Sequence, residues 1–152
     1  MNQNHYYTNQ PNSKSQEKHF RYVLKGFTFQ FASDNGVFSK NTIDFGSQLL
    51  IESYEVPTHL AKGKLLDVGC GYGPMGLSFA KANPQMSVEM VDVNERAMEL
   101  AKRNAETNGI QNVTIYESNT YDNVHEKDYS VIISNPPIRA GKDVVHRILE
   151  EA

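Results

Sequence analysis

Four glycines, spread over eight positions, follow a short apolar run near the middle of the chain. The run Leu65–Val68 stops at Gly69, and further glycines stand at positions 71, 73 and 76. Glycine lets a backbone turn tightly and approach a ligand closely, and a helix that begins at Pro74 would aim free N–H groups at that ligand. Asp92 ends a second apolar run about 20 residues further on, where a carboxylate can bind ribose hydroxyls. The pattern therefore predicts a nucleotide-type ligand.

Two classes of enzyme use a turn of this kind. The glycines at 71, 73 and 76 match the G-x-G-x-x-G pattern of nicotinamide dehydrogenases. They also run as Gly69-x-Gly71-x-Gly73 directly after Leu-Asp-Val, which is closer to the acidic-x-Gly-x-Gly-x-Gly turn of class I methyltransferases. A glycine turn with a purely structural role is a third interpretation, but it does not explain why an acidic residue, Asp92, ends the second apolar run.

The segment Ser134–Ile138 (SNPPI) follows a further apolar run and indicates which chemistry the turn serves. Asn-Pro often begins a plain turn, yet Asn135 and Pro136 also offer two acceptors, an amide oxygen and a backbone carbonyl. A conjugated amine is a poor nucleophile because its lone pair is delocalised. Two acceptors that bind both of its hydrogens favour a pyramidal nitrogen, and consecutive prolines hold them in place. We therefore predict Asn135, Pro136 and Pro137 as the catalytic residues of an amine methyltransferase.

The composition limits the other classes of function. The 152 residues are enough for one domain with a core and too few for two. No apolar run approaches the ~18 residues of a membrane span, and no secretory signal is recognisable. One cysteine, Cys70, excludes an internal disulfide, and the histidines show no ligand spacing. We expect a cytoplasmic protein without metal or membrane, and a net charge of −3 means that any RNA contact is local.

Strands and helices alternate around these motifs. Period-two alternation predicts a β-hairpin from His19–Leu24 and Phe27–Phe31, followed by a loop over Ala32–Asp44. The later expected elements are a helix over Phe45–Val56, a strand at Leu65–Val68, a helix over Pro74–Ala82, a strand at Val88–Val93, a helix capped by Asn94 and ended at Asn108-Gly109, strands at Val113–Tyr116 and Tyr129–Ile133, and a helix over Asp143–Glu151. The order predicts an α/β fold, a Rossmann-like, doubly wound and mostly parallel sheet with an N-terminal hairpin.

The expected organisation is a flexible tail over residues 1–17 and a single domain over residues 18–152. Within it we expect the hairpin at 18–33, a loop and helix at 34–61, and the cofactor-binding core at 62–152. The last expected strand is apolar on both faces yet lies at or near an edge, so we expect a sheet that lacks its C-terminal strands. Basic residues near the hairpin form either a solvated face or, if contiguous, an RNA contact; they are Lys14, Lys18, His19, Arg21 and Lys25.

Over about residues 35–147 the chain resembles the small-domain class I methyltransferases that modify a guanine exocyclic amine in small-subunit ribosomal RNA. The resemblance rests on the segments GVFS (36–39), DFGS (44–47) and NPPIRAGK (135–142), and on the glycine turn with Asp92. It implies S-adenosyl-L-methionine (AdoMet) as cofactor and RNA as partner. The cofactor-binding residues that it implies are Phe38, Asp67, Gly69, Gly71, Gly73, Asp92, Val93, Asn94 and Asn119. For the substrate we predict Ile138 against the target base and Arg139 and Lys142 near phosphates.

Two alternatives remain open at this point. One is methylation of a glutamine or another amino group in a protein, although Ile138 replaces the aromatic residue that adenine and glutamine methyltransferases place there. The other is an AdoMet-binding fragment without turnover, because the sheet is expected to be incomplete.

Overall fold

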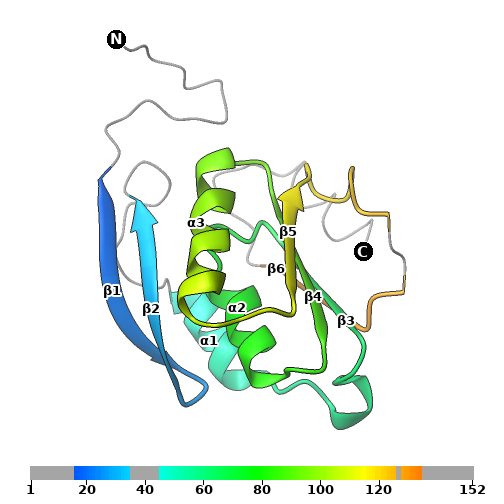
Figure 1. The fold of residues 1–152 in the computed structure, drawn as a ribbon. Coiled ribbons are helices and arrows are strands. Elements are labelled where there is room, and N and C mark those ends of the chain that lie inside the picture. Colours follow the sequence, from blue (N-terminus) through cyan, green and yellow to red (C-terminus); the bar gives the residue numbers. More distant parts are fainter. Residues whose placement is uncertain (1–15, 35–44, 126–127, 135–152) are drawn as a thin grey trace.

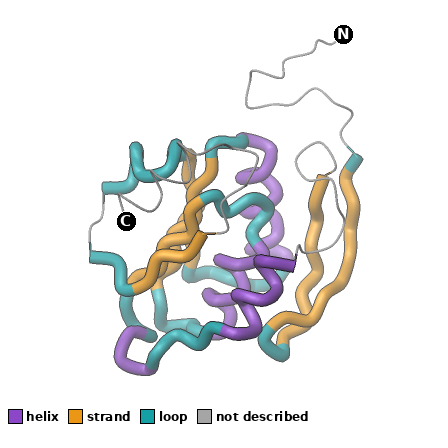
Figure 2. The backbone as a smooth tube through the Cα atoms, turned by 180° about the vertical axis from the view of Figure 1, so that it is seen from behind, coloured by secondary structure: helices purple, strands orange, loops and turns teal. Residues whose placement is uncertain are grey.

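The computed structural model describes residues 16–34, 45–125 and 128–134. In chain order the elements are β1 (Glu17–Leu24), β2 (Phe27–Asp34), α1 (Phe45–Ser53), the 3-10 helix η1 (Thr58–Leu60), β3 (Lys64–Val68), α2 (Pro74–Ala82), β4 (Ser87–Asp92), α3 (Glu95–Thr107), β5 (Val113–Glu117) and β6 (Val131–Ser134). They form three layers, in which the helices lie between the β1–β2 hairpin and the sheet of β3 to β6 (Figure 1). Figure 2 shows the same layers from behind.

The four strands β3 to β6 form a parallel sheet in the order β5-β4-β3-β6. The chain first adds strands on one side of β3 and then places β6 on the other side, so β3 marks the topological switch point where α/β proteins bind ligands. The register pairs Val68 with both Val91 and Ser134, and it pairs Asp92 with Glu117. The carboxyl ends of all four strands therefore lie at one edge, the upper one in Figure 1. This confirms the predicted α/β fold.

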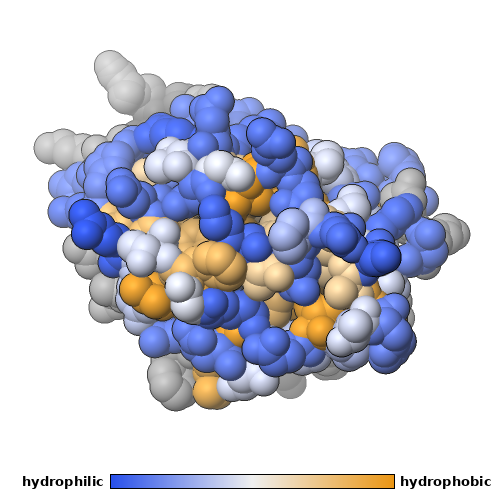
Figure 3. Space-filling model, turned by 60° about the horizontal axis from the view of Figure 1, so that its bottom comes forward, coloured by the Kyte–Doolittle hydropathy of each residue, from blue (hydrophilic) through white to orange (hydrophobic). Residues whose placement is uncertain are grey.

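Apolar side chains cover both faces of the sheet. The larger cluster fills the space between the hairpin, the helices and one face, and it includes the buried Phe31, Phe79 and Met90. The smaller cluster on the opposite face contains Leu66, Val68 and Val91. At the opposite end of the molecule from the strand carboxyl ends, the surface is mostly hydrophilic, with apolar residues toward its middle (Figure 3). In the part of the chain that is described, no helix has both the length and the apolar character for a membrane span.

The hairpin is confirmed, but β2 continues to Asp34, where the sequence predicted a loop from Ala32. The outer edge of β2 is bonded by the amide side chains of Asn104 in α3 and of Asn108, the residue that caps the C-terminus of α3. Asn104 accepts from the N–H of Ala32 at 2.8 Å and donates to its carbonyl at 3.0 Å, and Asn108 makes the same pair with Gln30 at 2.9 and 2.9 Å. These bonds satisfy backbone groups that would otherwise need another strand. The polar residues at 33 and 34 concealed the strand from sequence analysis.

An arginine at the start of α3 holds the open end of the hairpin. Arg96 binds Asp34 at 2.9 Å, Glu17 at 3.0 Å and Glu99 at 2.8 Å. Its guanidinium thus joins both hairpin strands to the helix that directly follows Asp92. Because the fork of N–H groups has a fixed geometry, the three bonds also fix the angle between hairpin and helix.

The basic residues near the hairpin do not gather as one exposed cluster. The Lys25 side chain is only 7% exposed. It donates to the Tyr54 carbonyl at 2.8 Å and lies 5.1 Å from the centroid of the Phe79 ring. His19 contacts Glu17 at 2.8 Å, and Lys14 lies outside the described residues. An RNA contact was expected only if the basic residues formed one contiguous exposed patch. The Lys25 side chain is buried and therefore cannot be part of such a patch.

Helix α1 ends at Ser53, three residues before the predicted Val56. Two local causes act together. Lys25 takes up the Tyr54 carbonyl, and the residue before Pro57 is disfavoured in helical conformation. Helix α2 spans the predicted residues, and the Asn94 side chain caps α3 as predicted, accepting from the Ala97 N–H at 3.0 Å.

The last described strand, β6, runs over Val131–Ser134 rather than the predicted Tyr129–Ile133. The Tyr129 hydroxyl donates to Glu89 Oε1 at 2.6 Å, so Tyr129 is held by its side chain and β6 begins two residues later. The strand forms one edge of the described sheet, as predicted. The predicted helix over Asp143–Glu151 lies outside the described residues.

Candidate functional site

The turn after β3 adopts backbone conformations that favour glycine. The φ angles are 74° at Gly69, 60° at Gly71 and 109° at Gly73, all in the left-handed region. A Cβ atom at Gly69 would meet nothing within 4 Å, whereas one at Gly73 would lie 2.8 Å from Leu77 Cδ1. The φ angle of 109° is therefore what favours glycine at position 73, and Gly69 leaves open space beside the turn. That open space lies at the edge of the sheet where ligands bind.

Asp92 fastens the turn to the neighbouring strand. Its Oδ2 accepts from the Gly71 N–H at 2.8 Å, and its Oδ1 accepts from the Asn94 N–H at 2.9 Å. The N–H groups of Gly69 and Cys70 both donate to the Val91 carbonyl at 2.9 Å. A carboxylate offers about four lone-pair positions, so Asp92 can accept two further hydroxyl groups while it holds the turn.

Asp67 lies fully buried beneath the turn. Its Oδ2 accepts from the Gly76 N–H at 2.9 Å, and its Oδ1 has no hydrogen-bond partner among the described residues. Burial raises the pKa of Asp67 to about 7; the Gly76 N–H acts in the opposite direction, and the charge of Asp92 adds to the rise. A buried carboxylate with one unused oxygen is complementary to a cationic group.

The remaining described residues of the predicted cofactor site lie along the same edge. Val93 is 47% exposed directly after Asp92 and offers an apolar surface. The Ser118 N–H donates to the Asp92 carbonyl at 2.9 Å, which brings the loop with the exposed Asn119 next to β4. The side chain of Asn94 is committed to capping α3, so its backbone is the part that faces Asp92.

The predicted catalytic and substrate residues lie outside the described residues, as does Phe38; they are Asn135, Pro136, Pro137, Ile138, Arg139 and Lys142. The structure does place the residue before them. Ser134 pairs with Val68, and its Oγ donates to the Val68 carbonyl at 3.1 Å. The chain therefore leaves β6 beside the last residue of β3, one residue before the glycine turn.

Cys70 lies buried inside the turn. Burial raises the pKa of its thiol well above the ordinary value, and the charges of Asp67 and Asp92 act in the same direction. The thiol, which donates to the Gly71 carbonyl at 3.5 Å, stays protonated near neutral pH and supplies no thiolate. Among residues 16–34, 45–125 and 128–134, no group of three or more His, Cys, Asp and Glu could hold a metal ion.

One residue next to the turn was missed by sequence analysis. Asn104 is 1% exposed, and its Nδ2 donates to the Tyr72 carbonyl at 2.9 Å in addition to its bonds with Ala32. A signal was present, because position 104 shares the helix face of the buried Ala97, Ala101 and Ala105. An amide on an otherwise apolar helix face is a buried polar group that must have partners.

The switch point at β3, the glycine turn and the acid that ends β4 belong to a Rossmann-like fold, and its likeness to a solved methyltransferase makes it a class I AdoMet-dependent methyltransferase fold. The model of the methyltransferase small domain matches residues 28–152. The chain therefore belongs to the methyltransferase small-domain family, and AdoMet is the cofactor of that family. The buried free oxygen of Asp67 and the open space at Gly69 fit the cationic methionine end of this cofactor.

Individual relatives extend the comparison. The chain is 51% identical over 149 residues to the Bacillus subtilis (strain 168) protein YbxB, covering 97% of this chain and 73% of that protein. It is 38% identical over 144 residues to ribosomal RNA small subunit methyltransferase C of Vibrio vulnificus (strain CMCP6), covering 93% and 41%. The structure of the T. thermophilus 16S rRNA N2 guanine methyltransferase in complex with AdoMet and guanosine matches with a TM-score of 0.75 at 25% identity, over 91% of this chain and 39% of that one. The chain spans about two fifths of the length of these last two proteins.

Proposed function

We propose that this protein transfers a methyl group from AdoMet to the exocyclic amine of a guanine in small-subunit ribosomal RNA. The observation that carries the proposal is the pairing of Val68 with Ser134. Ser134 directly precedes Asn135, so this pairing supports a proposed arrangement in which the Asn135-Pro136-Pro137 segment orients the amine next to a methyl donor at the switch point. Two relatives, one a small-subunit rRNA methyltransferase and one an N2 guanine methyltransferase, support the choice of substrate.

In the proposed arrangement, different described residues bind different parts of the cofactor. The carboxylate of Asp67, buried beneath the turn, attracts the methionine ammonium, the turn Gly69–Gly73 lies along the methionine, and Asp92 accepts from the ribose hydroxyls. The exposed side chain of Val93 packs against adenine, and Asn119 accepts from its amino group. The positive charge of the donor thus sits above two carboxylates in a partly dry site, where Coulomb attraction is strong.

The chemical step needs orientation more than a base. The bound cofactor supplies an electrophilic methyl group on a sulfonium. The guanine nitrogen forms the new N–C bond with its lone pair while the C–S bond breaks and its electron pair stays on sulfur. Asn135 and Pro136 accept hydrogen bonds from the two amine N–H groups, and this orients the nitrogen lone pair toward the methyl carbon. The nitrogen becomes acidic as the methyl group arrives and then releases one proton to solvent.

Asp92→Ala tests the cofactor site. The substitution removes the proposed ribose acceptor and also frees the N–H of Gly71, so we expect the Kd for AdoMet to rise by about 10- to 100-fold. Isothermal calorimetry measures the change. Glu106→Ala, which removes an exposed carboxylate near the other end of α3, serves as control and leaves the Kd within twofold. Equal affinities for wild type and Asp92→Ala would contradict the placement of the ribose.

The substrate is tested with tritiated AdoMet and ribosomal RNA from cells that lack this protein. We expect incorporation into the small-subunit RNA, and mapping should find the label on N2 of a guanine. Naked RNA and assembled small subunits are assayed in parallel to identify the form that is recognised. Label in ribosomal protein would favour the glutamine alternative. AdoMet binding without any incorporation would favour a binding fragment without turnover.

A further inference from the structure

The glycine turn is attached to the hairpin through Tyr72. The Tyr72 ring is 4% exposed and packs edge-on against Phe20 and Phe31, with centroid distances of 6.2 and 5.8 Å. The residue stands between Gly71 and Gly73, both of which have positive φ angles. Because glycine populates positive and negative φ about equally, the turn has little conformational preference of its own. Its shape must come from bonds to neighbouring elements.

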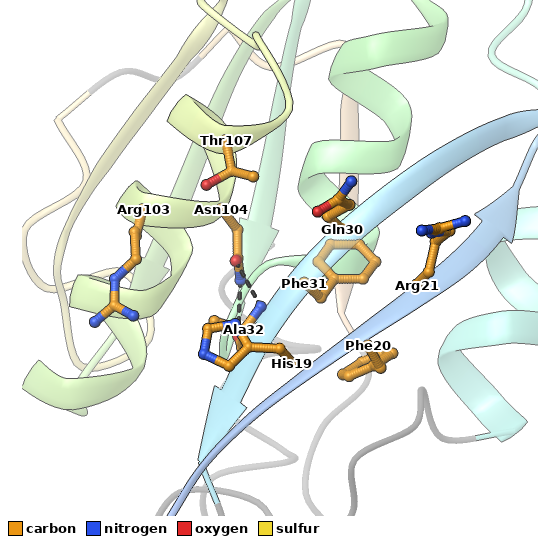
Figure 4. Close-up of a pocket in the computed structure, with 9 residues that line it drawn as sticks. All are labelled: His19, Phe20, Arg21, Gln30, Phe31, Ala32, Arg103, Asn104 and Thr107. Carbon is orange, nitrogen blue, oxygen red and sulfur yellow. Dashed lines mark hydrogen bonds between the residues drawn. The ribbon is translucent and has the colours of Figure 1, made fainter.

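Asn104 supplies such a bond from α3. Its amide lines a pocket of about 280 Å³ between the hairpin and α3, where Figure 4 draws its two bonds to Ala32. The same Nδ2 also donates to the Tyr72 carbonyl at 2.9 Å. Both N–H groups and the oxygen of the amide are therefore used, and a buried amide whose groups are all satisfied tolerates little displacement.

We propose that Asn104 is a positioning residue of the cofactor site, which holds the Tyr72 carbonyl and so makes the hairpin a brace for the glycine turn. The inference rests on the proposed function, in which this turn holds AdoMet. Asp92 fixes the Gly71 N–H from the sheet side, and Asn104 fixes the Tyr72 carbonyl from the α3 side. With both bonds in place the turn is ordered before the cofactor arrives, and less binding free energy is spent on ordering it.

The chain contains a matched control one helical turn further on. Asn108 bonds the N–H and the carbonyl of Gln30 at 2.9 and 2.9 Å, just as Asn104 bonds Ala32. Its amide reaches the Asn104 carbonyl at 2.7 Å instead of Tyr72. Asn108→Ala therefore removes the same kind of support from the hairpin edge, while the bond to the glycine turn stays in place.

The experiment compares Asn104→Ala and Asn104→Ser with Asn108→Ala in the full chain. Calorimetry measures the Kd for AdoMet at a temperature where circular dichroism shows every variant folded, and amide hydrogen exchange is followed at residues 71–73. We expect both substitutions of Asn104 to raise the Kd, about 10-fold for alanine, and to speed exchange in the turn. Asn108→Ala should lower the melting temperature and leave the Kd and the exchange of the turn unchanged.

The possible results separate the two proposals. An unchanged Kd in both Asn104 variants, with tight binding by wild type, would overturn the positioning role alone. Equal weakening by Asn108→Ala would also overturn it, because loss of hairpin packing would then explain the effect. Wild-type protein that does not bind AdoMet would overturn the proposed cofactor site together with this inference. If Asn104→Ala fails to fold, Asn104→Ser, which keeps one donor, decides between these results.

Discussion

Asn135→Ala is expected to reduce methyl transfer to RNA by about 10³-fold while the Kd for AdoMet stays within a few-fold. The reason is the division of labour at the site. The glycine turn and the two acids are proposed to bind the donor, whereas Asn135 is proposed to accept from the amine and orient its lone pair. Loss of one positioned hydrogen-bonding group at a reacting centre commonly costs about 10²- to 10³-fold in rate. Single-turnover transfer of tritiated methyl groups to ribosomal RNA measures the rate.

Ser134→Ala is the matched control for this substitution. Ser134 directly precedes Asn135, and its hydroxyl donates to the Val68 carbonyl at the end of the sheet. Its loss removes a hydrogen bond of ordinary strength and should change the transfer rate by less than about fivefold. Transfer by Asn135→Ala at a rate close to that of wild type would reject the amine-orienting role and, with it, the assignment as an amine methyltransferase.

Asp67→Asn is expected to change how stability depends on pH. Burial and the charge of Asp92 raise the pKa of Asp67 to about 7 in the folded protein, against about 4 in an unfolded chain. Between these values the folded protein keeps a proton that the unfolded chain has released, so the free energy of unfolding falls as the pH rises from 4 to 7. A difference of about three pH units corresponds to about 4 kcal/mol. Asparagine still accepts from the Gly76 N–H and does not ionise.

Urea unfolding of both proteins between pH 4.5 and 8 measures this difference. We expect wild type to lose stability relative to Asp67→Asn toward neutral pH and the gap to stay constant above pH 8. Asp128→Asn is the control, because Asp128 lies at the surface and its bond to Lys64 lowers its pKa. Because a carboxyl with a lowered pKa titrates below pH 4.5, that substitution should leave the curve parallel to that of wild type over the range measured. Parallel curves for wild type and Asp67→Asn would show that Asp67 does not titrate in this range.

Local patterns made most of the sheet and part of the site predictable. The glycines, Asp67 and Pro74 lie within ten positions of one another, so their geometry follows from a strand, a turn and a helix start. The parallel order of the strands then placed Asp92 beside the turn without knowledge of side-chain packing. Asn94 was predictable as a cap because capping depends on three or four adjacent residues.

Contacts between distant residues made the rest unpredictable. Strand β2 extends past Phe31 because Asn104, 72 positions away from Ala32, bonds its edge. Lys25 was expected to be exposed, yet its side chain is buried because its ammonium donates to the Tyr54 carbonyl and lies over the Phe79 ring. The link from Asn104 to Tyr72 spans 32 positions, and neither residue carries a motif that points to the other. In each case the local element followed from propensity, whereas the end of the strand, the burial of Lys25 and the link to Tyr72 depend on long-range hydrogen bonds.

The amide pair on α3 also bears on how this chain can vary in evolution. Two asparagines four residues apart on a helix rise about 6 Å, close to the spacing of alternate residues on a strand. The two amides can therefore bond two alternate residues of β2 and hold its edge against the end of α3. Their bonds reach backbone atoms of Gln30 and Ala32. The exposed side chain at position 30 can therefore vary among relatives at little cost, whereas Ala32 is buried in the core and a change at Asn104 or Asn108 requires compensation elsewhere.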